Sequence, residues 1–492
     1  MTPDAPPRRD TAPRGLALAG LFLGPVLFVA MLLLPAPAGL GATGWSVAAV
    51  VALMAVWWLS QAIPLAATAL LPALLFPVMG VRDLGAATAP YAHPLIFLFL
   101  GGFVVALTIE RWNLHRRIAI AVISATGQGA GRLMGGFMLA TAGLSMWVSN
   151  TATTLMMVPI ALSVVSLLDD PDAPASSGAS ADRFARGLLI AVAYAASIGG
   201  LATLIGTPPN AFLAGFMDQT HDLRIGFFEW MLVGVPVSAA MLLAAWVLLA
   251  RILFRTDAIS VDGVRRSLAG QRAALGRPGR GERLTAVLFA AVALLWVVRP
   301  LIERAVPVSD AGIALAAALA AFVVPVNLRE RVFLMDWDHA KRLPWGILLL
   351  FGGGLSLAGA IQSSGLAVWL GDRLAGAADL SVVLVLVLAV ALVVFLTELT
   401  SNTATAAVFV PVAATLGISL GIAPVTLAAP VALAASCAFM MPVATPPNAI
   451  VFGSGRLTVM HMCCAGIVLN VIGIALISAA ALYLIPLVFP AG

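Results

Sequence analysis

The sequence predicts an all-α polytopic membrane protein made of two repeats, each with a re-entrant hairpin and a broken helix. Composition predicts the membrane class, because 61% of the 492 residues are hydrophobic and only 10% are charged, against roughly 25% charged in an ordinary soluble domain. Two duplicated motifs predict the repeats. Ser-Asn-Thr-Ala-Thr occurs at Ser149–Thr153 and Ser401–Thr405, and Thr-Pro-Pro-Asn-Ala occurs at Thr207–Ala211 and Thr445–Ala449.

The first part of the chain reads as membrane spans, since an apolar run of about 20 residues crosses a bilayer. Such runs lie near Gly15–Leu34, Trp45–Leu59, Ile63–Met79 and Pro94–Ile109. The first run is longer than the apolar region of a secretory signal, which spans about 7–15 residues. We therefore expect it to be retained, with the basic N-terminus in the cytoplasm. The basic, amphipathic stretch Arg111–Ser124 is typical of a helix on the cytoplasmic surface.

Each duplicated motif interrupts an apolar segment in the first half. Leu133–Leu168 is broken in its middle by Trp147–Thr151, which predicts a hairpin with Ser-Asn-Thr at its tip. After a polar loop at Asp169–Asp182, the segment Arg183–Met217 predicts a helix broken at Gly206–Pro209, because two consecutive prolines remove two helix hydrogen bonds.

The second half repeats this plan after a span at Phe227–Phe254 and an arginine-rich linker, residues 255–283, which we expect in the cytoplasm. The basic loop Asn327–Arg342 is expected on the same side. The remaining elements are spans near Leu284–Ile302, Ala311–Val326 and Leu343–Ile361, an amphipathic stretch at Leu366–Leu374, a hairpin at Ser381–Leu420, a broken helix at Val425–Ser454 and a last span at Cys464–Phe489. The count of crossings brings the second unit into the membrane from the opposite side, so the repeats are inverted.

The motif residues indicate an ion and anion site. Hairpin tips and unwound helices expose backbone groups that lipid cannot satisfy, so they survive only inside protein or along a watery cavity. Serine hydroxyls and the amide oxygens of Asn150 and Asn402 suit a small hard cation such as sodium. The helix N-termini after each Ser-Asn-Thr suit an anion. Polar breaks at matching positions in two apolar halves therefore indicate a secondary transporter.

With these motifs, the chain resembles a known family, the divalent anion:sodium symporters, which are also called INDY-type di- and tricarboxylate transporters. The resemblance rests on Trp57–Pro64, on Glu110–Arg117 and on both motif pairs, and it covers nearly the whole chain. It implies eleven transmembrane helices plus two opposed hairpins, a scaffold domain that dimerises and a transport domain that moves like an elevator. One departure is Gln61, where many relatives are expected to carry an acidic residue.

The resemblance also implies the site. One sodium ion would lie between Ser145, Ser149, Asn150 and the carbonyl group of Gly206, and the other between Thr397, Ser401, Asn402 and the carbonyl group of Ala444. The substrate would meet Asn150, Thr151, Asn402 and Thr403, with Thr207, Thr445 and Pro446 closing the pocket. Geometry agrees, because Ser145 and Thr397 each precede their serine by four residues, one helical turn back on the same face.

The expected organisation has five segments: N-terminal scaffold helices 1–92, a first repeat unit 93–217, scaffold helices with the linker 218–342, a second repeat unit 343–455 and a C-terminal helix 456–492. The expected protein is an integral protein of a bacterial cytoplasmic membrane and a homodimer. Its expected partners are lipid, sodium ions as co-transported cofactor and a dicarboxylate, without nucleic acid.

The expected function is sodium-coupled symport of C4-dicarboxylates such as succinate, fumarate and malate into the cell. A sodium-independent dicarboxylate exchanger stays open, as does citrate or sulfate as the transported anion. Symport is favoured because the motif residues keep their oxygen donors and include no arginine or lysine. An enzyme is not expected, since the chain has no His-Glu-x-x-His pattern and Gly453–Gly455 lacks the context of a serine nucleophile. Glu398 has two interpretations, a structural acceptor or a proton-coupling group.

Overall fold

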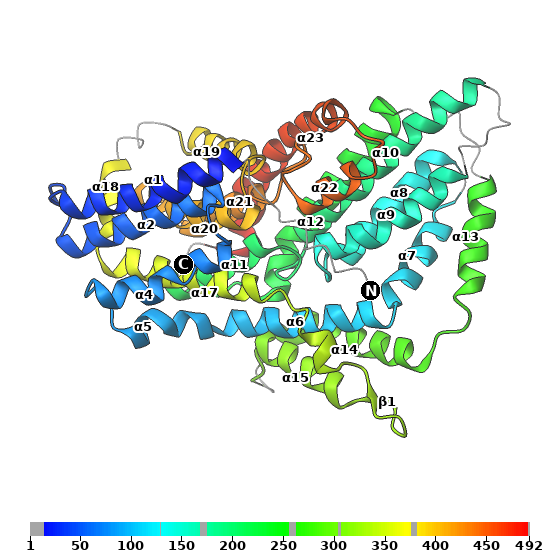
Figure 1. Cartoon of the computed structure of the whole chain (residues 1–492), viewed down its shortest axis with the longest axis horizontal. Helices are drawn as coiled ribbons and strands as arrows, with labels where there is room; N and C mark the ends of the chain where they lie inside the picture. The colour runs from blue at the N-terminus through cyan, green and yellow to red at the C-terminus, as the bar shows by residue number, and fades with distance from the viewer. Residues whose placement is uncertain are drawn as a thin grey trace. The chain divides into compact units, whose positions relative to one another are not determined.

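The computed structural model describes residues 14–127, 129–167, 175–254, 262–303, 307–374 and 381–490, and these are almost entirely helical (Figure 1). Within them, eight helices are long and apolar enough to cross a membrane. The predicted class, an all-helical polytopic membrane protein, is therefore confirmed. A short antiparallel pair, β1 (Pro325–Asn327) with β2 (Val332–Phe333), was not predicted. The chain divides into two compact units, Met1–Ala92 with Gly346–Arg373, and His93–Trp345 with Leu374–Gly492.

The first unit differs from the sequence prediction at one span. The segment near Ile63–Met79 is divided into α3 (Leu65–Thr68) and α4 (Leu71–Val78). A Cβ atom on Gly353 would lie 2.1 Å from the carbonyl oxygen of Ala69, so glycine permits the close approach of α17 to this break. The other elements are α1 (Arg14–Leu33), α2 (Ala42–Ser60), α5 (Leu84–Thr88), η1 (Ala89–Ala92), α17 (Trp345–Ser363) and α18 (Leu366–Leu374).

The second unit begins with the first hairpin and the first broken helix. The polar loop is shorter than the predicted Asp169–Asp182, because α10 already begins at Ala175. The elements in this part are α6 (Pro94–Arg111), α7 (Leu114–Ala125), α8 (Ala130–Ser145), α9 (Asn150–Ser166), α10 (Ala175–Gly200), α11 (Pro208–His221), α12 (Phe227–Val247) and a π-helical turn η2 (Leu248–Leu253).

The rest of the second unit contains the second hairpin and the second broken helix. The linker 255–283 contains a helix, which was not predicted. The span predicted to reach Val326 ends earlier, at Val323, before β1. The elements are α13 (Asp262–Ala274), α14 (Arg280–Ile302), α15 (Asp310–Val323), α16 (Trp337–Ala340), α19 (Val382–Thr397), α20 (Asn402–Ser419), α21 (Pro424–Ala434), α22 (Pro446–Phe452), α23 (Val459–Ala479), η4 (Ala480–Leu484) and α24 (Ile485–Val488).

Packing within the second unit interlocks the two halves. Helices α8 and α9 of the first hairpin pack on α10, and α20 of the second hairpin packs on α21. The distal half of each broken helix contacts the other half's hairpin, because α22 packs on α9 and α11 packs on α20. A Cβ on Gly199 would lie 2.4 Å from the carbonyl oxygen of Ala142, so α8 and α10 meet at backbone distance. Each hairpin is thus held by both broken helices.

Candidate functional site

Both hairpins turn at the duplicated Ser-Asn-Thr motif and have the same tip geometry. Ser145 ends α8 and donates its hydroxyl to Asn150 Oδ1 at 2.6 Å. Thr397 ends α19, and its Oγ1 lies 2.9 Å from Asn402 Oδ1. Ser145 and Thr397 are fully buried. In each hairpin, the last residue of one helix therefore fixes the amide oxygen of the first residue of the next.

The first tip faces the break of α10 and α11 through a glycine. A Cβ on Gly200 would lie 2.7 Å from Asn150 Oδ1 and 3.1 Å from the carbonyl oxygen of Gly206. These two oxygens therefore lie on either side of the space that the missing Cβ of Gly200 leaves open. The Ser145 hydroxyl lies beside the same space, since it donates to Asn150 Oδ1. Uncharged oxygen donors that converge in this way fit a hard cation. Ser149 is the N-cap of α9, where its Oγ accepts from the N–H of Ala152 at 3.3 Å.

The second tip meets its break at a different carbonyl group. Thr397 Oγ1 lies 2.8 Å from the carbonyl oxygen of Ala435, the first residue after α21. Ala435 was not among the predicted residues. Ala444 lies at the other end of the same break, and Ser401 is the half-buried N-cap of α20 without a side-chain cap hydrogen bond.

The asparagines of Thr-Pro-Pro-Asn hold the breaks. Asn210 Nδ2 donates to the carbonyl oxygens of Gly200 at 3.2 Å and Thr203 at 2.9 Å. Asn448 Nδ2 donates to those of Ala438 at 3.2 Å and Met441 at 3.0 Å. A broken helix leaves buried carbonyl groups that need partners, and these asparagines supply them in both halves. Asn210 and Asn448 were not among the predicted site residues, although the duplicated motif contains them.

The two threonines of this motif have different partners. Thr207, the N-cap of α11, places its Oγ1 3.3 Å from Ser436 Oγ in the other break, and both residues are buried. Thr445, the N-cap of α22, instead accepts from the N–H of Asn448 at 3.3 Å. Thr207 therefore joins the two breaks directly. Three other predicted substrate contacts lie in the first turns of the neighbouring helices. Thr151 and Thr403 are half-buried there, and Pro446 is exposed.

Each tip is tied to its own broken helix by a different chemistry. In the first half, Thr203 donates its hydroxyl to the carbonyl oxygen of Met146 at 2.5 Å. In the second half, Glu398 accepts from three consecutive backbone N–H groups, those of Phe439 at 2.7 Å, Met440 at 2.9 Å and Met441 at 2.9 Å. Asn470 Nδ2 donates to the same carboxylate at 2.7 Å. This geometry supports the structural-acceptor interpretation of Glu398, with the broken helix rather than the hairpin as its partner.

Helix N-termini also belong to this site. Helices α9 and α20 begin at Asn150 and Asn402, directly after the tips. The first turn of a helix carries partial positive charge and N–H groups without helical partners, which favour an anion. Oxygen donors for cations and helix N-termini for an anion thus occur at the same two tips.

Two hairpins and two broken helices, joined at their breaks, define a transporter-like class of polytopic membrane protein. Residues 17–489 match the family described as "Sodium:sulfate symporter transmembrane region", and the chain belongs to this family. This confirms the resemblance found in the sequence.

Individual relatives cover nearly the whole chain. It is 41% identical over 477 residues to the "Sodium-dependent dicarboxylate transporter SdcS" of Staphylococcus saprophyticus, which covers 95% of this chain and 91% of the relative. It is 40% identical over 476 residues to SdcS of Staphylococcus aureus strain USA300, which covers 96% of this chain and 92% of the relative.

Two solved structures share the fold at low identity. The YdaH transporter of Alcanivorax borkumensis has a TM-score of 0.54 and 17% identity, over 83% of this chain and 87% of that chain. MtrF of Neisseria gonorrhoeae has a TM-score of 0.56 and 13% identity, over 93% and 94%.

Proposed function

We propose that this chain is a sodium-coupled symporter that carries C4-dicarboxylates into the cell. The observation that carries the proposal is the matched pair of hairpin tips, in which Ser145 meets Asn150 and Thr397 meets Asn402. The names of the similar SdcS proteins, sodium-dependent dicarboxylate transporters, agree with it.

In this proposal, each tip binds one sodium ion through uncharged oxygens, and the substrate lies between the tips. The first ion takes Ser145, Ser149, Asn150 and the carbonyl group of Gly206; the second takes Thr397, Ser401, Asn402 and the carbonyl group of Ala444. The substrate takes Asn150, Thr151, Thr207, Asn402, Thr403, Thr445 and Pro446.

Coupling follows from charge. A dicarboxylate brings two negative charges into a site of low dielectric constant, where an uncompensated ion is costly. The motif residues include no arginine or lysine to offset that charge. Sodium ions at the two tips compensate it, so each species lowers the cost of binding the other.

The membrane arrangement is part of the same proposal. The protein lies in a bacterial cytoplasmic membrane with its N-terminus in the cytoplasm, has eleven transmembrane helices in the five segments given above, dimerises through its scaffold and moves the hairpins as an elevator. The support is the family membership and the bacterial origin of the similar relatives.

Uptake of radiolabelled succinate into proteoliposomes tests the function. An inward sodium gradient is compared with potassium, and empty vesicles are compared with vesicles preloaded with unlabelled succinate. Uptake into empty vesicles only with sodium would establish symport. Uptake that ignores sodium but requires preloading would establish exchange, and stronger competition by sulfate or citrate than by fumarate or malate would assign the other anions.

The site assignment has its own test. Asn150→Ala and Asn402→Ala are each expected to abolish sodium-driven uptake, because the tip loses the amide oxygen that faces both the cation and the substrate. The dimer is expected to remain intact by size-exclusion chromatography. Asn327→Ala, at the end of β1, is the control. Robust uptake by both tip variants would overturn the assignment.

A further inference from the structure

A cavity of about 500 Å³ opens beside the first hairpin, entirely within the second unit. One wall belongs to the hairpin and includes Val148, Thr153 and Met156. The opposite wall carries charged groups and imidazoles, among them Glu110, Arg111, His339 and Arg342. Its volume falls in the range of small-molecule sites, about 300–1,000 Å³. Its residues are not those assigned above to the transported ions and anion.

Thr153 gives this cavity an unused hydrogen-bonding group. The residue is 1% exposed, and its Oγ1 has no hydrogen-bond partner among the described residues. The matching Thr405 of the second hairpin has one, since its Oγ1 lies 2.7 Å from Thr400 Oγ1. The position that matches Thr400 in the first hairpin is Val148, which has no hydroxyl. A buried hydroxyl without a partner costs stability. Because Thr153 lies on the cavity wall, rotation of its side chain toward the cavity would let a ligand there supply the missing partner.

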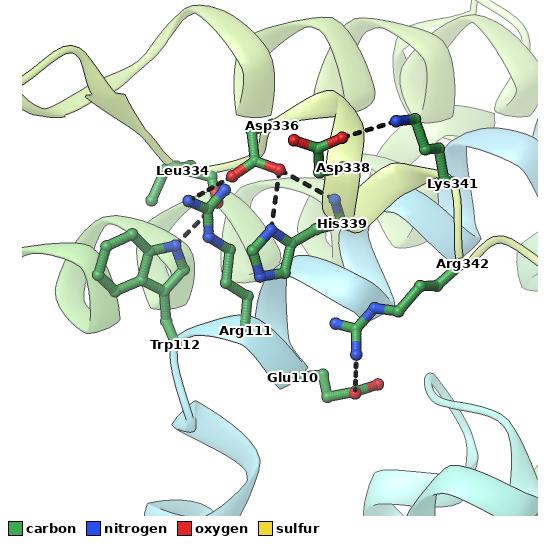
Figure 2. A network of polar contacts seen from close by, with 9 residues as sticks. All are labelled: Glu110, Arg111, Trp112, Leu334, Asp336, Asp338, His339, Lys341 and Arg342. Atoms are coloured by element: carbon green, nitrogen blue, oxygen red, sulfur yellow. Dashed lines mark hydrogen bonds and ion pairs between the residues drawn. The ribbon is translucent and has the colours of Figure 1, made fainter. Parts of the chain in front are cut away.

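The opposite wall offers a cation with donors to spare (Figure 2). Arg342 Nη1 lies 3.6 Å from Glu110 Oε1, and the Arg342 side chain is 53% exposed. A guanidinium group has five N–H donors, and this single long ion pair leaves most of them for a ligand. Arg111 differs, because its Nη2 lies 2.7 Å from Asp336 Oδ2 and its Nη1 donates to the carbonyl oxygen of Leu334. Arg111 therefore fixes the wall, and Arg342 faces the cavity as the adaptable cation.

The hairpin wall adds a second favourable field for an anion. Ala152 and Thr153 line the cavity from the first turn of α9, which begins at Asn150. The N-terminal turn of a helix carries partial positive charge. A hydroxyl donor, a helix N-terminus and a guanidinium group thus border one space of suitable size.

We propose that this cavity is a second, weaker station for the transported carboxylate anion, separate from the hairpin tips and independent of sodium. Thr153 donates to one carboxylate group and Arg342 pairs with the other. The inference rests on the proposed function for the identity of the anion. Sodium is not needed here, because arginine supplies the positive charge that the Ser-Asn-Thr motifs lack.

Equilibrium dialysis of radiolabelled succinate against the purified full-length protein tests the station. Binding is measured in sodium chloride and in choline chloride at the same ionic strength. We expect one weak site per chain to persist in choline chloride. Arg342→Gln is expected to weaken that binding about twofold to fivefold, the scale of a partly exposed ion pair. Thr153→Val is expected to weaken it to a similar extent while the melting temperature stays the same or rises.

Two variants serve as controls. Arg329→Gln removes an exposed arginine of the β1–β2 loop and should leave the weak site unchanged. Asn402→Ala should remove the sodium-dependent binding and keep the weak site.

Each other outcome has a defined meaning. Absence of succinate binding in choline chloride, with sodium-dependent binding intact, would overturn the station and leave the proposed function standing. Equal losses in Arg329→Gln and Arg342→Gln, or loss of the weak site in Asn402→Ala, would also overturn it. Absence of succinate binding in both salts would overturn the dicarboxylate assignment together with the station.

Discussion

At the scale of single residues, Gly200 controls the space between the first tip and its break. An added Cβ would meet Asn150 Oδ1 at 2.7 Å and the carbonyl oxygen of Gly206 at 3.1 Å. Gly200→Ala is therefore expected to push apart the oxygens proposed for the first sodium ion. Overpacking of this kind costs about 1–3 kcal/mol, which corresponds to a roughly fivefold to 150-fold loss of sodium-driven uptake. The sodium dependence of succinate uptake measures it.

Gly143→Ala in α8 is the matched control, because a Cβ there meets nothing within 4 Å. That variant should transport normally and be slightly more stable, since alanine is the better helix former. Normal sodium dependence in Gly200→Ala would show that the Gly200 position does not border a cation site.

Glu398 is a second position where one group decides local structure. Its carboxylate accepts from three backbone N–H groups and from Asn470. Glu398→Gln replaces one acceptor oxygen with an NH₂ group that faces these donors, so we expect a loss of stability of about 2–4 kcal/mol. Thermal unfolding in detergent measures it, with the half-exposed Glu303→Gln as the control near zero. A stable Glu398→Gln variant whose uptake has lost its pH dependence would instead favour the proton-coupling interpretation.

At the scale of elements, the broken helices depend on one asparagine each. The Nδ2 atoms of Asn210 and Asn448 satisfy carbonyl groups that the breaks leave open. Asn210→Asp and Asn448→Asp would each place an acceptor oxygen against those carbonyl oxygens. We expect each to lower the free energy of unfolding by about 2–4 kcal/mol and to remove uptake. Thermal unfolding and uptake of the two variants measure this, and unchanged stability in both would contradict the role assigned to the motif.

At the scale of the whole molecule, contacts between segments that are distant in the sequence stabilise the described part of the second unit. Arg111 at the end of α6 pairs with Asp336 at 2.7 Å, and Trp112 Nε1 donates to the carbonyl oxygen of Leu334 at 2.8 Å (Figure 2). Partial burial opposes ionisation of Asp336, but hydrogen bonds from His339 and the charge of Arg111 lower its pKa below the ordinary value. The ion pair should therefore contribute to stability above about pH 4, the pKa of an unfolded aspartate.

Asp336→Asn should consequently lower the free energy of unfolding by about 1 kcal/mol or less, because Asp336 is 44% exposed. The melting temperature should fall with it, by a constant amount between neutral pH and about pH 5. That difference should disappear as the pH falls through the lowered pKa of the folded state. Melting curves of the two proteins across pH measure it. Asp338→Asn, whose side chain is 86% exposed, is the control and should differ little from the parent protein at any pH.

The sequence by itself determined the class, the repeats, both hairpin tips and the presence of both helix breaks. The first break was predicted at Gly206–Pro209, but in the structure α10 already ends at Gly200 and Pro208 begins α11. Apolar runs fix membrane spans because lipid cannot satisfy backbone groups, and the duplicated motifs mark both hairpin tips and both breaks. These are local properties of the chain. Some limits of the prediction were also local, since the span predicted near Ile63–Met79 is divided into α3 and α4 and the linker contains α13.

Only the tertiary structure decided which oxygens meet. No spacing along the chain shows that Thr397 contacts Ala435, that Thr207 contacts Ser436 or that Asn210 spans its break. The tertiary structure also distinguished two halves that look alike in sequence. Glu398 binds a backbone segment in the second half, whereas Thr203 makes the corresponding contact in the first. Thr405 has Thr400 as its partner, whereas Val148 at the matching position leaves Thr153 without one among the described residues. The physical reason is that hydrogen bonds depend on the approach of separate segments, whereas a motif specifies only its own local backbone.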